Sequence, residues 1–340
     1  MMVKKIPKIS VVMPVYNTGE ILRASIDSIL LQTFDNFELI MVDDGSADDT
    51  YSICEQYAAQ DGRIVLLHQE NKGVCAARNR GIEVSRGEYV TFCDHDDIYS
   101  PRKLEAQYLL AKKYAADIVN VGYETIYNSE RRDTEGVDLC CRGKDDISRE
   151  FFRIAGSCLG TVWVKLYKKT TFDGIFRFDT KYARGEEDVN FNYRLLQRVS
   201  VFVSSKDVLY SYVVRDAYST SQNIYPVVVE GMCDEIMAMH HYMQKNDIDA
   251  IKRQSEYRKV LSRQVAVLCV YMIKCGFSYE KFASVLDSIK QPLRLVERTY
   301  CDCRNLRNDM LLYLVTCGKC GSYVVYATLA IAVRIKCLIG

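Results

Sequence analysis

A regular alternation of strand and helix patterns over residues 8–123 constrains the fold more than any other feature. Five apolar, β-branched runs have the character of strands buried on both faces: KISVVMPVY, FELIMV, RIVLLH, GEYVTFC and DIVNVGY. Between them, residues 17–32, 50–60 and 73–85 carry apolar residues at helical spacing. Strands that alternate with helices predict an α/β fold with a Rossmann-like, mostly parallel, doubly wound sheet.

The rest of the chain changes character twice. After the fourth strand, Ser100 and Pro101 predict a helix with a serine N-cap and proline in its first position. Residues 125–144 are polar and predict a loop or a poorly paired strand excursion, residues 184–197 predict a helix, and VSVFVSS and DVLYSYVV predict strands. Beyond residue 226 the pattern is helical. We therefore expect a catalytic domain over 1–225, with halves of about 8–123 and 145–225, and a helical region over 226–340.

Composition excludes some classes of protein. The 340 residues are 49% hydrophobic with a net charge of +1, enough for a large core and without the basic excess of a nucleic-acid-binding protein. The first ten residues lack the apolar segment of a signal peptide, so we expect the 14 cysteines to be reduced thiols in a cytoplasm. Two pairs, Cys301/Cys303 and Cys317/Cys320, could hold zinc, although one intervening residue in the first pair is unusual for such sites.

Unusual polar residues follow three of the predicted strands. They are Tyr16-Asn17 after the first strand, Asp43-Asp44 after the second, and the acids of the CDHDD stretch after the fourth. Ligands of doubly wound sheets bind beyond the carboxyl ends of the strands, so these residues predict one shared site. The first strand is not followed by GxGxxG, which argues against a dinucleotide-binding domain.

The acidic stretch itself favours a divalent metal. Asp94, Asp96 and Asp97 fall within four positions, and clustered carboxylates repel one another unless a cation neutralises them. A hard metal held by one or two carboxylates has positions left for water and phosphate oxygens, as in a diphosphate site. The alternative is a solvated acidic loop in which one aspartate caps the next helix.

Five stretches, in this order, are similar to one enzyme family. They are SVVMPVYN, SILLQTFDNFELIMVDDGSADDT, NKGVCAARNRGI, GEYVTFCDHDD and GEEDVNFNYRL. Together they resemble family 2 of the inverting glycosyltransferases with the A-type fold, which use nucleotide-diphosphate sugars. The resemblance covers roughly residues 8–220. It implies a metal-dependent sugar transfer, with Mn²⁺ or Mg²⁺ as the cofactor.

The resemblance also implies roles in donor binding. It assigns the nucleoside to the turn at Pro14, Val15 and Tyr16, the imide hydrogen of the base to Asp44, and positions near the base and phosphates to Lys72 and Arg78. Asp94 and Asp96 match the two acids of the DXD motif, with Asp96 as the direct metal ligand and Asp94 closer to the ribose. Lys72 could equally lie on a solvated helix face, and Asp43-Asp44 could be a turn with capping acids.

The remaining implied roles concern the acceptor and the transferred sugar. Asp188 matches the catalytic base, and Glu187 lies beside it, although both acids could simply satisfy the dipole of a helix first turn. Trp163 and Lys165 match a segment that borders the acceptor site, where packing is the alternative for a lone tryptophan. Arg215, Ser219 and Ser221 resemble a loop that closes over the diphosphate, or form an ordinary surface loop. His95 departs from the usual small or polar residue between the acids and is either a sugar contact or a bystander.

These inferences predict an inverting transferase that moves one sugar from a UDP-sugar to a hydroxyl of a growing glycan, in cell-surface polysaccharide biosynthesis. A sugar-1-phosphate nucleotidyltransferase would need a glycine-rich, basic first loop, and PVYNTGEI has neither property. A non-catalytic glycan-binding protein would not need both the metal acids and Asp188.

The C-terminal third leaves two interpretations open. Residues 231–340 carry 16 basic and 10 acidic side chains, and the apolar run Gly321–Val333 has 13 residues, too few for the ~20 that span a bilayer. The run could be a core helix. Because acceptors in this family are often glycans on a lipid diphosphate, it could instead attach a cytoplasmic protein peripherally to the inner face of the membrane through residues after 300.

Overall fold

The computed structural model describes residues 6–172, 176–182, 185–215, 226–295 and 322–329. The chain forms two compact units. One comprises Met1–Ala183 with Glu187–Ser219, and the other comprises Arg184–Glu186 with Thr220–Gly340. The four C-terminal cysteines considered for zinc, as well as Ser219 and Ser221, lie outside the described residues.

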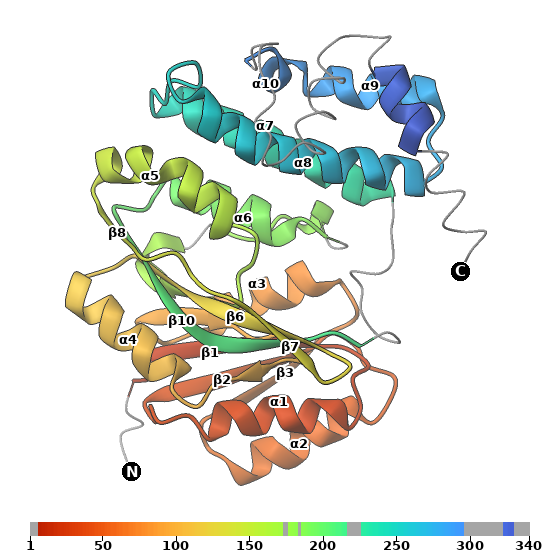
Figure 1. The fold of residues 1–340 in the computed structure, drawn as a ribbon. Helices are drawn as coiled ribbons and strands as arrows, with labels where there is room; N and C mark the ends of the chain where they lie inside the picture. The colour runs from red at the N-terminus through yellow and green to blue at the C-terminus, as the bar shows by residue number, and fades with distance from the viewer. Residues whose placement is uncertain (1–5, 173–175, 183–184, 216–225, 296–321, 330–340) are drawn as a thin grey trace. The chain divides into compact units, whose positions relative to one another are not determined.

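The first unit is built on a mixed sheet with the strand order β3-β2-β1-β4-β9-β6-β10-β5 (Figure 1). The first four of these strands are parallel: β3 (Ile64–His68), β2 (Phe37–Asp43), β1 (Ile9–Val15) and β4 (Tyr89–Phe92). Strand β9 (Lys165–Lys168) runs antiparallel to β4 and β6, and β10 (Val201–Val213) runs parallel to β6 (Ile118–Tyr127). The α/β fold expected from the sequence is confirmed.

Helices cover both faces of the parallel strands, which explains why their sequences are mostly apolar. Figure 1 places α1 (Ile21–Leu30) and α2 (Thr50–Gln60) on one side of the sheet and α3 (Val74–Val84) on the other. Val11 packs in the same core cluster as Leu22 of α1. Val12 faces α3, where a Cβ added to Gly81 would lie 2.3 Å from the Val12 Cγ1. Glycine at position 81 therefore lets α3 approach the strand.

The predicted start of α4 is wrong. The helix spans Lys103–Tyr114 with Arg102 as its N-cap residue, and the Leu104 N–H of its first turn donates to the side-chain oxygen of Gln32 at 3.0 Å. Ser100 instead follows the short strand β5 (Ile98–Tyr99), and its backbone N–H donates to the Leu209 carbonyl at 3.1 Å. The N-cap position belongs to Arg102, so Ser100 lies before the helix begins.

Residues 125–142 contribute paired strands, where the sequence predicted a loop or a poorly paired strand excursion. Strand β6 continues to Tyr127, turns through Asn128 and Ser129 with φ of 48° and 70°, and pairs with β7 (Glu130–Thr134). Positive φ at both central residues is the requirement of a type I′ hairpin turn. Strand β8 (Leu139–Arg142) pairs with β10. The two strand runs predicted near residues 199–214 are in fact one strand, β10, interrupted by register shifts.

Residues 144–196 add two helices to the described part of the first unit. Helix α5 spans Lys144–Ser157 and α6 spans Glu187–Leu196, with short 3₁₀ turns at Lys169–Phe172 and Thr180–Tyr182. The predicted apolar stripe of α6 is confirmed, since Val189, Tyr193 and Leu196 are all buried.

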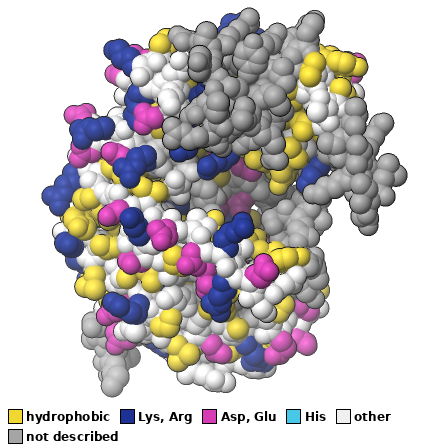
Figure 2. Space-filling view, in the orientation of Figure 1, with side chains coloured by type: hydrophobic (Ala, Val, Ile, Leu, Met, Phe, Trp, Pro, Cys, Tyr) yellow, Lys and Arg dark blue, Asp and Glu magenta, His cyan; other side chains and the backbone are white. Residues whose placement is uncertain are grey.

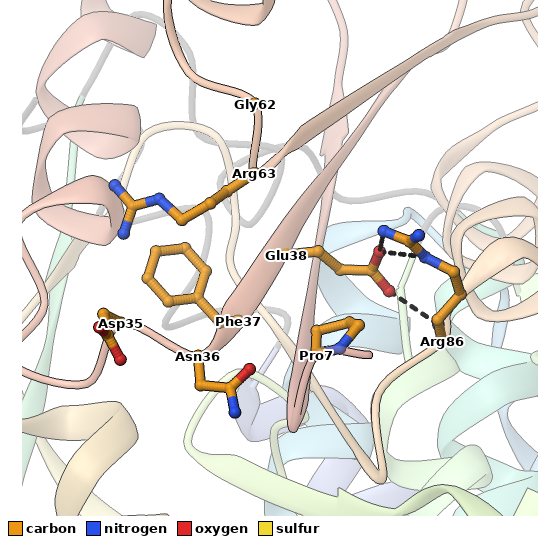
Figure 3. A pocket seen from close by; sticks show the side chains of 8 residues that line it. All are labelled: Pro7, Asp35, Asn36, Phe37, Glu38, Gly62, Arg63 and Arg86. Atoms are coloured by element: carbon orange, nitrogen blue, oxygen red, sulfur yellow. Dashed lines mark hydrogen bonds and ion pairs between the residues drawn. The ribbon is translucent and has the colours of Figure 1, made fainter. Parts of the chain in front are cut away.

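A cavity of about 220 Å³ lies at the amino end of β2, opposite the strand ends expected to bind ligands (Figure 3). Glu38 forms a clamp on its wall. Its carboxylate accepts hydrogen bonds from the Ser10 hydroxyl at 2.7 Å and from the Arg86 guanidinium at 2.6 and 2.8 Å. Arg63 lies over the Phe37 ring and pairs with Asp61 at 2.7 Å. The charged side chains on the cavity wall are thus engaged in contacts within the protein, which favours a structural role for this region over a ligand site.

The second unit is helical, as the sequence predicts. It contains α7 (Pro226–Lys245), α8 (Gln254–Lys274), α9 (Tyr279–Ser288) and α10 (Lys290–Arg294), and residues 322–329 are also helical. Helices α7 and α8 pack through buried apolar side chains and a hydrogen bond from Gln264 to Glu235 at 2.8 Å. Within the described parts of the chain, no helix is both long and apolar enough to cross a bilayer.

Candidate active site

The carboxyl ends of β1, β2 and β4 meet, as predicted. Side chains join the three loops that follow these strands. The Asn17 N–H donates to the Ser46 hydroxyl at 3.0 Å, and the Asn17 side chain accepts from the Ala47 N–H at 2.8 Å. The His95 ring contacts the Pro14 carbonyl at 3.1 Å through Nδ1. His95 therefore ties residues 94–97, called the acidic loop below, to the first strand end, a role that the sequence did not indicate.

Asp44 organises the loop that leads into α3. Its Oδ1 accepts from the Lys72 N–H at 2.9 Å and from the Gln69 amide at 2.7 Å, and its Oδ2 accepts from the Gly73 N–H at 2.8 Å. The Lys72 side chain is exposed, and Gly73 has a φ of 85° that favours glycine. The loop conformation thus depends on a buried carboxylate. At the end of β1, Pro14 and Val15 are buried and Tyr16 is exposed.

Arg78 is the electrostatic centre of the candidate site. Its Nη1 lies 2.8 Å from Asp188 and 3.1 Å from Glu187, and its Nη2 lies 3.0 Å from Asp94. The side chain is 3% exposed. Burial acts to lower the Arg78 pKa, but the attraction of the three carboxylates outweighs it and holds that pKa well above its usual value. One buried cation therefore holds three acids from two distant parts of the chain.

Asp188 is bound at both carboxylate oxygens. Oδ1 accepts from Arg78, and Oδ2 accepts from the Val162 N–H at 2.9 Å. Burial raises the pKa of Asp188 while Arg78 opposes the rise. Burial, together with the neighbouring Asp188 charge, raises the pKa of Glu187 to about 7. Two adjacent carboxyls with raised pKa values are typical of sites that take up and release protons near neutral pH.

The acidic loop is paired with a second arginine. Arg215 Nη1 lies 3.5 Å from the Asp96 carboxylate and also bonds to the Asp96 carbonyl. Burial raises the pKa of Asp96, and the neighbouring Asp94 charge adds to this effect. Asp94 and Asp96 are partly exposed, whereas Asp97 is fully buried. The three clustered acids thus have different surroundings: two face ion-pair partners, and the third is enclosed by protein.

The structure gives Trp163 and Lys165 packing environments. The Trp163 ring stacks on Tyr210 with a centroid distance of 4.3 Å and an interplanar angle of 21°, and only 7% of the residue is exposed. Lys165 is fully buried, its ammonium donates to the Thr161 carbonyl, and burial lowers its pKa to about 8. The packing alternative describes both residues in this structure, and their contact with an acceptor stays a prediction.

The donor set at the acidic loop suits a hard cation. No group of three or more potential metal-ligating side chains is preassembled among the described residues. Asp94 and Asp96 nevertheless supply two partly exposed carboxylates, the oxygen ligands that Mg²⁺ and Mn²⁺ prefer. Mg²⁺ characteristically takes one or two carboxylates and completes its shell with water and substrate phosphates, so two acids are sufficient.

Sequence reasoning missed two features of the site. One is the Val162 N–H, a backbone group that no side-chain motif could reveal. The other is Asp97, whose carboxylate accepts from the Tyr210 hydroxyl at 2.7 Å and from the Val213 N–H at 2.9 Å. The sequence signal for Asp97 was the third acid itself, which is one more than a two-acid metal motif requires.

Comparison with known proteins identifies the family of the chain. Residues 10–160 match the family described as Glycosyl transferase family 2. The glycosyltransferase GlyG of Streptococcus pneumoniae is 36% identical over 214 residues, which cover 59% of this chain and 70% of GlyG. The chain belongs to glycosyl transferase family 2.

Other relatives of this glycosyltransferase match it over shorter shares of their length. The putative glycosyltransferase EpsH of Bacillus subtilis is 36% identical over 169 residues, covering 49% of this chain and 48% of EpsH. Among solved structures, S. aureus TarS 1–349 in complex with UDP-GlcNAc has a TM-score of 0.71 at 17% identity, covering 97% of this chain and 92% of that one. The similarity to TarS supports the A-type glycosyltransferase fold. Asp188 and Arg215 lie beyond the 10–160 match, so their roles depend on geometry.

Proposed function

We propose that this glycosyltransferase moves one sugar from a UDP-sugar to a hydroxyl of a growing glycan, with inversion at the anomeric carbon and Asp188 as the general base. The observation that carries the proposal is the anchoring of Asp188. Its oxygens accept from Arg78 at 2.8 Å and from the Val162 N–H at 2.9 Å, while the same arginine lies 3.0 Å from Asp94. The base and the acidic loop are therefore fixed relative to each other by one guanidinium.

Asp188 would accept the proton of the acceptor hydroxyl as that oxygen attacks the sugar. Each carboxylate oxygen has a second lone pair, so the proton can be taken while Arg78 and Val162 keep their hydrogen bonds. The Arg78 charge favours the ionised base before the proton arrives, and burial favours the neutral acid afterwards. One base and an in-line attack give inversion.

Donor binding is assigned to the loops at the ends of β1, β2 and β4. TarS, which shares the fold, is described in complexes with UDP and with UDP-GlcNAc, which supports a uridine diphosphate donor here. Pro14, Val15, Tyr16 and Asp44 would hold the nucleoside, and Lys72 and Arg215 would lie near the phosphates. Because Asp44 already orders the Gln69–Gly73 loop, it could present a preformed surface to the base.

Asp96, with Asp94, would hold Mn²⁺ or Mg²⁺. When bound, such a cation stabilises the negative charge that develops on the departing diphosphate. We expect Asp96→Asn to abolish the metal dependence of UDP binding without unfolding the protein. UDP affinity that kept its full response to Mn²⁺ in this variant, measured by titration calorimetry, would assign the metal elsewhere.

The proposed cellular role is polysaccharide assembly at the cytoplasmic side of a membrane, with an acceptor glycan that could be linked to a lipid carrier. The named relatives are glycosyltransferases, which supports a transferase over the nucleotidyltransferase and glycan-binding alternatives. Most residues after 300, which would provide the peripheral membrane contact, lie outside the described residues.

The test is to incubate the full chain with Mn²⁺ and a panel of nucleotide sugars and to follow the release of nucleoside diphosphate. We expect slow hydrolysis of one UDP-sugar. The configuration of the first released sugar, read by NMR before it mutarotates, should be opposite to that of the donor. Retained configuration, or activity only with nucleoside triphosphate and sugar phosphate, would refute the proposal.

A further inference from the structure

The third acid of the acidic loop has a different environment from its neighbours. Asp97 is fully buried, while Asp94 and Asp96 are partly exposed. Its Oδ1 accepts from the Val213 N–H at 2.9 Å, and its Oδ2 accepts from the Tyr210 hydroxyl at 2.7 Å. Both donors lie in the last four residues of β10, which ends at Val213. Asp97 therefore binds the end of that strand rather than a ligand.

Tyr210 closes the connection on the other side of the acidic loop. Its hydroxyl donates to Asp97 and accepts from the Asp94 N–H at 3.3 Å. The Asp97 N–H in turn donates to the Asp94 carbonyl at 3.2 Å. The two ends of the four-residue acidic loop, Asp94 and Asp97, are thus hydrogen-bonded to each other and to the Tyr210 hydroxyl. Stacking of Trp163 on the Tyr210 ring fixes the position of that phenol.

Arg215 follows Val213 by two residues and reaches back to the acidic loop. Its Nη1 bonds to the Asp96 carbonyl and lies 3.5 Å from the Asp96 carboxylate. Between the Asp97 bond and the arginine, the Val214 N–H is held by the Ile126 carbonyl at 2.9 Å. The two backbone N–H groups before Arg215 are therefore both held by hydrogen bonds, and the acceptor for the first of them is the Asp97 carboxylate.

We propose that Asp97 is a positioning residue for donor binding, which sets the guanidinium of Arg215 over Asp96 by fixing the end of β10 against the acidic loop. The proposal rests on the proposed function, in which Asp96 and Arg215 meet the diphosphate of the donor. A preformed arrangement of these two groups avoids the entropy cost of ordering them when the ligand binds. Asp97 itself touches neither metal nor substrate in this scheme.

The experiment is a double-mutant cycle on UDP affinity in the presence of Mn²⁺, using the full chain. The variants are Asp97→Ala, Arg215→Ala and the double variant. Because Asp97 acts through Arg215, we expect Asp97→Ala to weaken UDP binding about tenfold and to cause no further loss when Arg215 is already alanine. Asp97→Asn, which can accept from Val213 and donate to Tyr210, should recover most of the affinity and also serves if the alanine variant does not fold.

Asp117 provides a matched control at the other end of β10. Its Oδ2 accepts from the Ser200 and Val201 N–H groups at 2.8 and 3.0 Å, so it also anchors this strand by a carboxylate. We expect Asp117→Ala to lower thermal stability while UDP affinity below the unfolding transition stays unchanged.

The outcomes separate the inference from the function on which it rests. Wild-type protein that does not bind UDP would overturn the proposed function and this inference with it. UDP binding by the wild type, combined with losses from Asp97→Ala and Arg215→Ala that multiply in the double variant, would overturn the inference alone. Equal effects of Asp97→Ala and Asp117→Ala on UDP affinity would likewise reduce Asp97 to a general stabiliser of β10.

Discussion

At the scale of single residues, the central group of the candidate site is Arg78. Its positive charge neutralises carboxylates that lie 16, 109 and 110 positions away in the chain. A buried guanidinium with three carboxylate partners is satisfied electrostatically, whereas a buried carboxylate without a partner would be costly. The arginine therefore explains how Asp188 and Glu187 can be ionised in a protein interior.

Replacement of Asp188 by asparagine tests its role as base. The amide keeps the shape of the side chain but cannot accept a proton, so turnover should fall by about 10²–10⁴-fold, the usual contribution of a positioned base. UDP affinity should stay close to the wild-type value. Turnover is measured as the release of UDP during hydrolysis of the donor that the wild type uses, and a variant that keeps its turnover but loses UDP affinity would make Asp188 a donor-binding residue.

Glu187 should determine part of the pH dependence. Burial and the Asp188 charge raise the pKa of Glu187 to about 7, and the two carboxyls titrate as a coupled pair. As the pH falls through this region the pair gains a proton, and kcat should decline because the base is less often ionised. Glu187→Gln removes the neighbouring charge, so the acidic limb of the kcat profile should move to lower pH.

A suitable control is Glu83→Gln, which removes a largely exposed carboxylate that pairs with Arg80. Its pH profile should match that of the wild type. A Glu187→Gln profile identical to both would mean that Glu187 does not share a proton with the base.

At the scale of elements, sequence predicted most of what depends on local pattern. The bounds of α2 agree with the predicted 50–60, and the stripe of α6 was correctly identified, because apolar spacing decides both. The serine cap of α4 was wrong because the helix begins at Lys103 and the Leu104 N–H of its first turn bonds to the distant side chain of Gln32. The ion pairs of Arg78 with Glu187 and Asp188 could not be predicted from local pattern, because only the fold brings α3 and α6 together.

Packing of α3 against β1 gives a prediction at this scale. Gly81→Ala would place a Cβ 2.3 Å from Val12 Cγ1, so the helix must move or the valine must change rotamer. We expect a loss of about 1–3 kcal/mol in the free energy of unfolding, the usual cost of overpacking. The loss is measured by urea denaturation.

The matched control is Gly62→Ala, since a Cβ at position 62 meets no atom within 4 Å. This variant should unfold at the same urea concentration as the wild type or slightly above it. Equal midpoints for Gly81→Ala and Gly62→Ala would mean that α3 can shift away from β1 without cost.

At the scale of the whole molecule, charge is distributed without a dominant sign. Figure 2 shows basic and acidic side chains interspersed over the described residues on the face drawn, in keeping with the net charge of +1. Attraction to an anionic surface would therefore depend on the local basic excess of the C-terminal third.

A chain that ends at Asn305 tests this expectation. If residues after 300 attach the protein to membranes, the shortened chain should no longer sediment with anionic liposomes at low salt, while it still hydrolyses donor slowly. The full-length protein should sediment and be released as salt is raised. Full-length protein that ignores liposomes, or a shortened chain that does not fold, would identify the tail as core.

Among the described residues, Asp94, Asp96, Glu187 and Asp188 form ion pairs with two arginines, Arg78 and Arg215, so the acids outnumber the cations that pair with them. A diphosphate entering alone would meet like charge, so under the proposed function the donor and the divalent cation favour each other's binding. Thermodynamic reciprocity makes the gain equal in both directions: whatever factor the cation adds to donor affinity, the donor adds to cation affinity. An enzyme deprived of donor would thus also tend to lose its cation, and Asp94 and Asp96 would return to their arginines.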